Sequence, residues 1–155
     1  MQKVLDQLND ELKRLERELR IELPREIKAA LAMGDLKENA EYHAALERQA
    51  YVKARIGQLR GRLTELRSVN LAQIPRDRVS LGSRVGLLDL DTDEEIRYEL
   101  AVPEMAESGD GLISVASPIG KGLMGRKVGD EVIIRIPSGT KQFEILELST
   151  VHDRA

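Results

Sequence analysis

The stretch MGDLKENAEYH, Met33 to His43, decides the fold of the N-terminal half because it separates two runs of regularly spaced apolar residues. Upstream of it, leucines recur at intervals of three and four residues, as in a coiled-coil helix, at Leu5, Leu8, Leu12, Leu15 and Leu19. The pattern continues less regularly through Leu23, Ile27 and Leu31. A second seam follows at Val52, Ile56, Leu59, Leu63 and Leu66. Two such helices joined by a short connection predict an antiparallel hairpin.

The connection itself carries helix-ending and helix-starting signals. Gly34 can adopt the left-handed conformation that ends a helix. Asp35 suits the N-cap of the next helix, and Glu38 stands three residues later, which completes a capping box. These signals predict a tight turn near residues 33–35. Pro24 lacks a backbone donor and predicts a kink in the first helix.

The second half of the chain has the shorter period of β-strands. Turn-forming residues separate five stretches that are typical of strands: RVSLGSRVGLLDL (78–90), EIRYELAV (95–102), GLISVAS (111–117), DEVIIRI (130–136) and KQFEILEL (141–148). Between the third and fourth, SPIGKGLMG (117–125) predicts one short helix, capped by Ser117, opened by Pro118 and ended by Gly125. The predicted class is α+β. It combines a coiled-coil hairpin domain over residues 1–74 with a small, mainly antiparallel β domain over residues 78–155.

Composition excludes several classes of function. The chain has 155 residues, of which 41% are hydrophobic, enough for packed cores. Only 3% are aromatic, which argues against a base-stacking nucleic-acid module, and the net charge of −3 argues against a nonspecific nucleic-acid binder. The absence of cysteine excludes disulfides and thiol nucleophiles. No apolar run approaches the ~20 residues that span a bilayer, so we expect a cytoplasmic protein with no membrane partner.

Two acids at the start of the second helix admit two interpretations. Asp35 and Glu38 can simply cap the helix. Alternatively, with Glu41 one turn further along, they form a hard oxygen site that suits Mg²⁺. Such a site would be weak and open, so a partner would have to supply the remaining ligands.

A run of basic residues on the second helix is equally open to two interpretations. Only Glu65 offsets the positive charge within this span, whose basic residues are Arg48, Lys53, Arg55, Arg60, Arg62 and Arg67. The run can be a phosphate-facing stripe, or it can be the solvated charged face of a coiled coil.

Two motifs resemble one known family. GDLKENAEYHAA (34–45) resembles the tip signature of the bacterial Gre transcript-cleavage factors, and SVASPIGKGLMGRKVGD (114–130) is similar to the Ser-Pro segment of their C-terminal domain. The resemblance covers nearly the whole chain. It implies that the hairpin enters the secondary channel of bacterial RNA polymerase. It also implies that an FKBP-like C-terminal domain docks on the channel rim through Ser117, Pro118 and Ile119.

The same resemblance implies which part of the cleavage chemistry this chain supplies and which part the polymerase supplies. Asp35 and Glu38 match the family's catalytic acids, which hold a Mg²⁺ ion shared with the polymerase active site. The polymerase then hydrolyses the 3′ RNA that backtracking has extruded. The protein is therefore expected to be a cofactor of the polymerase, active as a monomer, and not an enzyme on its own.

One departure from the family pattern keeps an alternative open. Leu31 and Leu46 occupy positions where the family commonly has arginines that grip RNA, so RNA contact is predicted to fall to Lys37, Arg48 and Lys53. The alternative is a channel-binding regulator or inhibitor of RNA polymerase with little cleavage activity. A prolyl isomerase is a third hypothesis, but the β domain has only Tyr98 and Phe143 as aromatics, too few for an apolar prolyl pocket.

Overall fold

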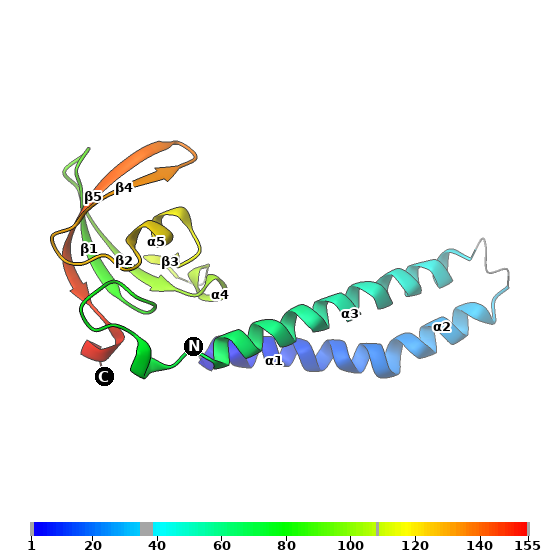
Figure 1. Ribbon diagram of the computed structural model, residues 1–155. Coiled ribbons are helices and arrows are strands. Elements are labelled where there is room, and N and C mark those ends of the chain that lie inside the picture. The colour runs from blue at the N-terminus through cyan, green and yellow to red at the C-terminus, as the bar shows by residue number, and fades with distance from the viewer. Residues whose placement is uncertain (1, 35–38, 108, 155) are drawn as a thin grey trace. The chain divides into compact units, whose positions relative to one another are not determined.

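The computed structural model describes residues 2–34, 39–107 and 109–154. It divides the chain into two compact units, Met1–Val69 and Asn70–Ala155. The first unit is a helical hairpin, and the second is a small sheet domain (Figure 1). The α+β class, with a helical hairpin followed by a mainly antiparallel sheet, is therefore confirmed.

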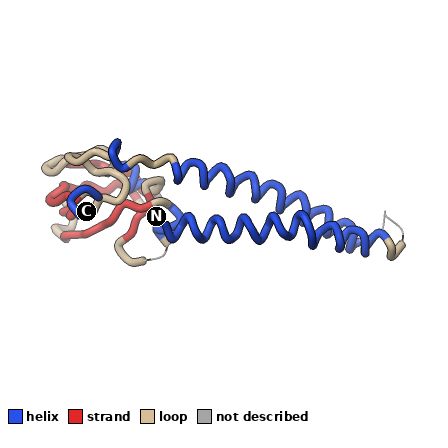
Figure 2. The backbone as a smooth tube through the Cα atoms, turned by 90° about the horizontal axis from the view of Figure 1, so that it is seen from below, coloured by secondary structure: helices blue, strands red, loops and turns tan. Residues whose placement is uncertain are grey.

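The hairpin consists of two helical arms that run side by side in both views (Figures 1 and 2). The first arm contains α1 (Gln2–Arg17), the π-helical turn η1 (Glu18–Glu22) and α2 (Leu23–Leu31), and the second arm is α3 (Ala40–Arg67). All five apolar residues predicted for the second seam are buried. Leu15 and Leu23 of the first arm pack with three of them, Val52, Ile56 and Leu59, in the core.

The π-helical turn explains why the leucine pattern of the first arm becomes irregular. In η1 the backbone N–H of Leu23 bonds the carbonyl of Glu18, five residues earlier, so the turn holds one extra residue. Without it, the heptads would bury residues 22, 26 and 29. Instead, Leu23 and Ala30 are buried and Ile27 is half-buried, each one position later.

The connection between the arms is longer than the sequence predicts. Gly34 has a positive φ of 132°, as expected for a chain reversal, but α2 has already ended at Leu31. Asp35 is not the N-cap of α3, because that position belongs to Asn39. The predicted capping box is therefore wrong.

The sheet unit contains five strands in the order β3-β2-β1-β5-β4. Its neighbouring strands are antiparallel except for β2 and β3, which are parallel. The bounds of the strands are β1 (Arg84–Asp89), β2 (Glu95–Ala101), β3 (Leu112–Ser114), β4 (Glu131–Ile136) and β5 (Gly139–Ser149). The first strand begins six residues later than predicted, because Ser80 and Ser83 form a hydrogen-bonded turn before it.

Short helices complete this unit. The predicted helix is α5 (Pro118–Leu123), which lies inside the curve of the sheet (Figure 1) and buries Leu123 against Ile134 and Phe143 in a common core. A second α-helix, α4 (Pro103–Ala106), was not predicted; it begins at a proline, a favourable first helical residue. The 3₁₀ turns are η2 (Leu71–Gln73) and η3 (Val151–Arg154). Within residues 2–34, 39–107 and 109–154, no helix combines the length and apolarity needed to cross a membrane.

Candidate functional site

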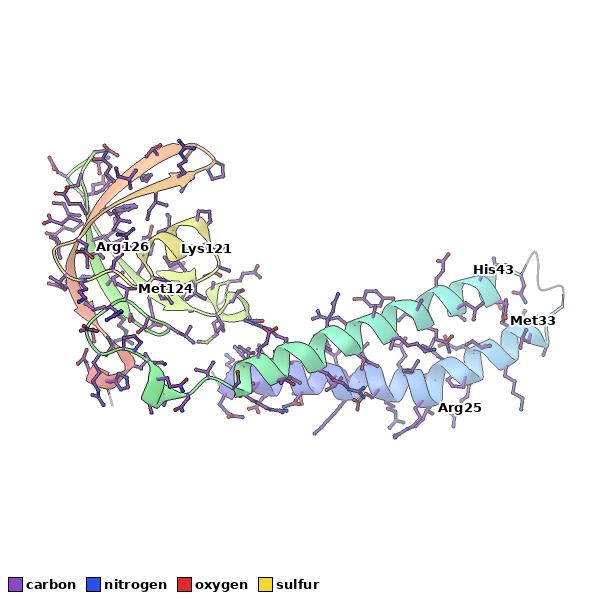
Figure 3. All side chains as sticks on the ribbon, viewed as in Figure 1. Arg25, Met33, His43, Lys121, Met124 and Arg126 are labelled. Carbon is purple, nitrogen blue, oxygen red and sulfur yellow. The ribbon has the colours of Figure 1, made fainter. Side chains whose placement is uncertain are left out.

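The first candidate site is the tip of the hairpin, where α2 ends and α3 begins. Figure 3 places Met33 and His43 there, at the end of one arm and the beginning of the other. The predicted catalytic acids Asp35 and Glu38, and the predicted RNA contact Lys37, lie outside the described residues. The structure thus describes the end of α2 and the beginning of α3, which flank the segment that contains the acids.

Asn39 closes this end of the hairpin. Its side-chain oxygen accepts a hydrogen bond from the backbone N–H of Tyr42 at 3.0 Å, which caps α3. Its side-chain nitrogen donates to the backbone carbonyl of Ala30 in α2 at 2.6 Å. One side chain therefore joins the C-terminal end of the first arm to the N-terminal end of the second.

Glu41, the third acid considered for a metal site, lies in the first turn of α3. A carboxylate at this position interacts favourably with the positive end of the helix dipole. It also lines a groove between the arms together with Glu26 and Arg48. Among the residues that the structure describes, no group of three or more histidines, cysteines or acids is arranged to hold a metal ion.

Four of the basic residues of α3 bond residues of the other arm, as expected for the charged face of a coiled coil. Arg48 donates two hydrogen bonds to Glu18, at 2.6 and 2.8 Å. Arg55 binds Glu11 through two bonds of 2.9 and 3.1 Å. Seven residues separate Arg48 from Arg55, and seven separate Glu18 from Glu11, so these pairs recur with the heptad on one flank of the seam.

The other flank repeats the same arrangement. Arg60 bonds Glu16 at 2.9 Å, and Arg67 bonds Asn9 at 3.2 Å, again with a step of seven residues in each arm. The seam thus has arginine-mediated contacts on both sides. These contacts favour the antiparallel register in which the apolar residues meet.

The ion pairs also shift the pKa of their members. The hydrogen bond from Arg55 lowers the pKa of the Glu11 carboxyl below its ordinary value of 4.5, and the guanidinium charge acts in the same direction. The hydrogen bond from Arg48 lowers the pKa of Glu18 in the same way. Both carboxyl groups are therefore held in the charged form that the pairing requires.

The structure describes two of the predicted RNA contacts, Arg48 and Lys53, and they differ in whether an acid pairs with their charge. Arg48 is held by Glu18, and its guanidinium also lies 5.1 Å from the centroid of the Tyr51 ring. Lys53 is exposed and has no ion pair with any residue in the described part of the chain. Leu31 and Leu46, where the resemblance leads us to expect arginines, are surface residues, because Leu31 is 43% exposed and Leu46 is 36% exposed.

Sequence reasoning missed two cations on the first arm. Arg25 and Lys28 of α2 are exposed, and neither forms a salt bridge within the described ranges. Figure 3 shows the Arg25 side chain pointing away from the partner arm. Their spacing of three residues, which puts both on one helix face, was the available signal.

The second candidate site is the Ser117–Ile119 segment at the start of α5. The Ser117 hydroxyl accepts a hydrogen bond from the N–H of Gly120 at 3.0 Å and donates to the carbonyl of Ser114 at 2.6 Å. Ile119 is half-buried against the core, whereas Pro118 is exposed. Figure 3 places Lys121 and Met124 on or just after the same helix. Of the three residues predicted for docking, Pro118 therefore offers the most accessible surface.

Comparison with known proteins agrees with this two-unit organisation. Residues 2–67 match the family model of the N-terminal domain of transcription elongation factors, and residues 74–150 match that of the GreA/GreB C-terminal domain. A helical hairpin joined to a small curled sheet is thus the architecture of a class of transcription elongation factors. The chain belongs to the GreA/GreB family of these factors.

Curated relatives match over most of their length. The transcription elongation factor GreA of Desulfotalea psychrophila is 47% identical over 143 residues, which cover 92% of this chain and 89% of the relative. GreA of Helicobacter hepaticus is 48% identical, with coverages of 92% and 88%. Among solved structures, the GreA factor homolog 1 (Gfh1) protein of Thermus thermophilus is 29% identical, covers 93% of each chain and gives a TM-score of 0.42. The family assignment rests on the sequence matches.

Proposed function

We propose that this transcription elongation factor binds bacterial RNA polymerase, inserts the Asn39 end of its hairpin into the secondary channel, and stimulates Mg²⁺-dependent cleavage of backtracked RNA. One observation carries the proposal. The connection that contains Asp35 and Glu38 joins two helical arms whose ends are bonded together by Asn39 and whose register is supported by arginine contacts on both flanks. Such a scaffold can present two carboxylates at a reproducible place inside a partner.

The acids suit the chemistry that the proposal assigns to them. Carboxylate oxygens are preferred ligands of Mg²⁺, but the ion needs about six ligands and usually keeps several waters. Asp35 and Glu38 would therefore hold the ion only together with groups of the polymerase. When bound, the ion supplies charge stabilisation for phosphodiester hydrolysis. Under this proposal the protein completes an active site of its partner and is not an enzyme alone.

Docking on the channel rim would use the start of α5. Pro118 is the accessible member of the predicted segment, while Ser117 and Ile119 hold the helix in place through the cap and the core. Pro118→Ala is therefore the suitable docking variant. A charged residue at position 119 would disturb the core as well as the surface.

The catalytic assignment is tested with a stalled, backtracked elongation complex whose RNA is labelled. Asp35→Asn and Glu38→Gln should each lower the cleavage rate at least ~10²-fold, because loss of metal coordination removes transition-state stabilisation. Binding to polymerase, measured by competition, should stay within about threefold. Pro118→Ala is the converse control, since it should weaken binding while leaving cleavage intact at saturating protein.

Two outcomes would contradict this assignment. If binding falls in proportion to cleavage, the acids have a structural role at the tip of the hairpin and not a catalytic one. A fall in melting temperature large enough to account for the lost activity would have the same meaning.

A second candidate function is favoured by the surface at Leu31 and Leu46. Both leucines are exposed where the family commonly has arginine, and Arg48 is already held by Glu18. A protein with this surface could occupy the channel and regulate the polymerase while gripping extruded RNA poorly.

Leu46→Arg separates the two functions. A new contact to an RNA phosphate worth about 1 kcal/mol would increase cleavage about fivefold at low salt, and the gain should shrink as salt is raised. Leu146→Arg is the matched control, because Leu146 is 37% exposed but belongs to β5 of the sheet unit. If wild-type protein binds polymerase without cleaving and Leu46→Arg does not add cleavage, the regulatory function is the better description.

A further inference from the structure

Asn39 uses both halves of its side-chain amide at the end of the hairpin. The oxygen accepts from the Tyr42 N–H at 3.0 Å, and the nitrogen donates to the Ala30 carbonyl at 2.6 Å. The orientation of the amide follows from the partners themselves. A backbone N–H can only donate and a backbone carbonyl can only accept, so the reversed orientation would lose both bonds.

The two partners are backbone groups that a helix end leaves without an intrahelical bond. Tyr42 N–H belongs to the first turn of α3, and the Ala30 carbonyl belongs to the last turn of α2, where it also accepts a bond from the N–H of Met33 at 3.2 Å. A single side chain thus satisfies a donor of one helix and gives an acceptor of the other a second hydrogen bond. The bond to Ala30 reaches a residue nine positions earlier in the chain than Asn39 itself.

We propose that Asn39 is a positioning residue for the transcript cleavage proposed above, on which this inference rests. By holding the end of α2 against the beginning of α3, it restrains both ends of the connection that carries Asp35 and Glu38. Glu38 is also its covalent neighbour in the chain. Reacting groups displaced by about 1 Å can lose ~10²-fold in rate, so a restraint at this point acts directly on the chemistry.

The alternative is that Asn39 is an ordinary N-cap, and the chemistry of capping residues separates the two roles. Serine, threonine and aspartate also accept the N–H bond of a cap, so they can replace the oxygen of Asn39. None of them carries the amide N–H that donates to Ala30. Asn39→Ser therefore keeps the cap and removes the bond between the arms without adding charge beside the acids.

The sheet unit offers a matched control. Asn70 is the N-cap of η2, and its side-chain oxygen accepts from the N–H of Ala72 at 3.0 Å. Asn70→Ser makes the same chemical change at a cap that joins no second helix. Any effect of Asn39→Ser beyond that of Asn70→Ser belongs to the contact with Ala30.

The experiment measures single-turnover cleavage in a backtracked elongation complex at saturating full-length protein, over a range of Mg²⁺ concentrations. We expect Asn39→Ser to slow cleavage about tenfold or more and to raise the Mg²⁺ concentration for half-maximal rate several-fold, since misplaced carboxylates coordinate the ion less well. Binding to polymerase should stay within about threefold, and any fall in melting temperature beyond that of Asn70→Ser should be too small to account for the lost rate. Asn39→Asp, which also keeps the cap, should share the loss of rate.

Three outcomes would overturn the positioning role. Cleavage by Asn39→Ser at the wild-type rate, with the wild-type Mg²⁺ dependence, would show that a cap is sufficient. A loss of rate with unchanged Mg²⁺ dependence and a lower melting temperature than Asn70→Ser would show a merely structural effect. Wild-type protein that binds polymerase but leaves the RNA uncut would refute the proposed function itself, and the positioning role with it.

Discussion

Gly57 and Gly61 lie on the exposed side of α3, between residues of its buried seam. A Cβ atom added at either position would meet nothing within 4 Å. In a helix interior, glycine is less favourable than alanine by up to ~1 kcal/mol, mainly because it loses more backbone freedom on folding. These positions therefore carry a conformational penalty with no packing reason for it.

Gly57→Ala and Gly61→Ala should each raise the free energy of unfolding by up to ~1 kcal/mol, as measured by urea denaturation. Gly120→Ala is the matched control with the opposite sign. Its added Cβ would lie 2.0 Å from the carbonyl oxygen of Ser114, which is too close for any real contact. Loss of stability in the two α3 variants would contradict the expectation and would indicate a partner for that face of the helix.

At the scale of elements, the hairpin depends on ion pairs between its arms as well as on the apolar seam. The pKa of Glu11 is lowered by the hydrogen bond from Arg55 and by its charge. A carboxyl whose pKa is lower in the folded state stabilises the fold above its unfolded pKa. That contribution is lost as the pH falls through the folded value. The arms should therefore separate more readily in acid.

We expect the stability of the hairpin, followed by helical circular dichroism, to decrease as the pH falls below about 4.5, the ordinary value for Glu11. Glu11→Gln should lower stability at pH 7 by about 0.5 kcal/mol, and it should flatten the acid dependence, so that variant and wild type converge once Glu11 is protonated in the folded state. Glu65→Gln is the control, because the ion pair of Glu65 with Arg62 lies within one helix and its carboxylate side chain is 70% exposed. An acid profile of Glu11→Gln that runs parallel to wild type would contradict the role of this pair.

The elements differ in how far the sequence alone predicts them. Periodicity predicted both arms and located all five strands, because burial of one face imposes a period that a local window can detect. Local rules predicted Asp35 as the N-cap, which is wrong, because Asn39 satisfies the same rules and its selection involves the distant carbonyl of Ala30. Periodicity could not decide the role of the α3 arginines, because Glu18 is 30 residues from Arg48 and Glu11 is 44 residues from Arg55.

At the scale of the whole molecule, the two units have separate cores. Phe143 and Leu123 belong to the core of the sheet unit, and Leu59 and Leu23 belong to that of the hairpin. No buried residue is shared between the two clusters as they are described. Each unit therefore has the apolar burial it needs to unfold as a cooperative element of its own.

Phe143→Ala should destabilise the sheet unit by about 3–5 kcal/mol, because it removes a fully buried ring and leaves a cavity. Hydrogen exchange should then show faster exchange in the strands and unchanged protection in α1 and α3. Leu59→Ala is the reciprocal variant, which should affect the hairpin and spare the strands. Equal loss of protection in both units from either change would mean that the chain unfolds as one cooperative body.

The π-helical turn Glu18–Glu22 has a consequence for how proteins of this architecture can change over time. An extra residue in one arm of a coiled coil would ordinarily rotate everything beyond it by about 100° and turn the far leucines outward. Here a single wide turn absorbs the additional residue, and the buried positions resume at Leu23 and Ala30. A single-residue insertion at this turn is therefore compatible with burial of the seam beyond it. The arm can vary in length among descendants while the side chains at its far end keep their orientation toward the second arm.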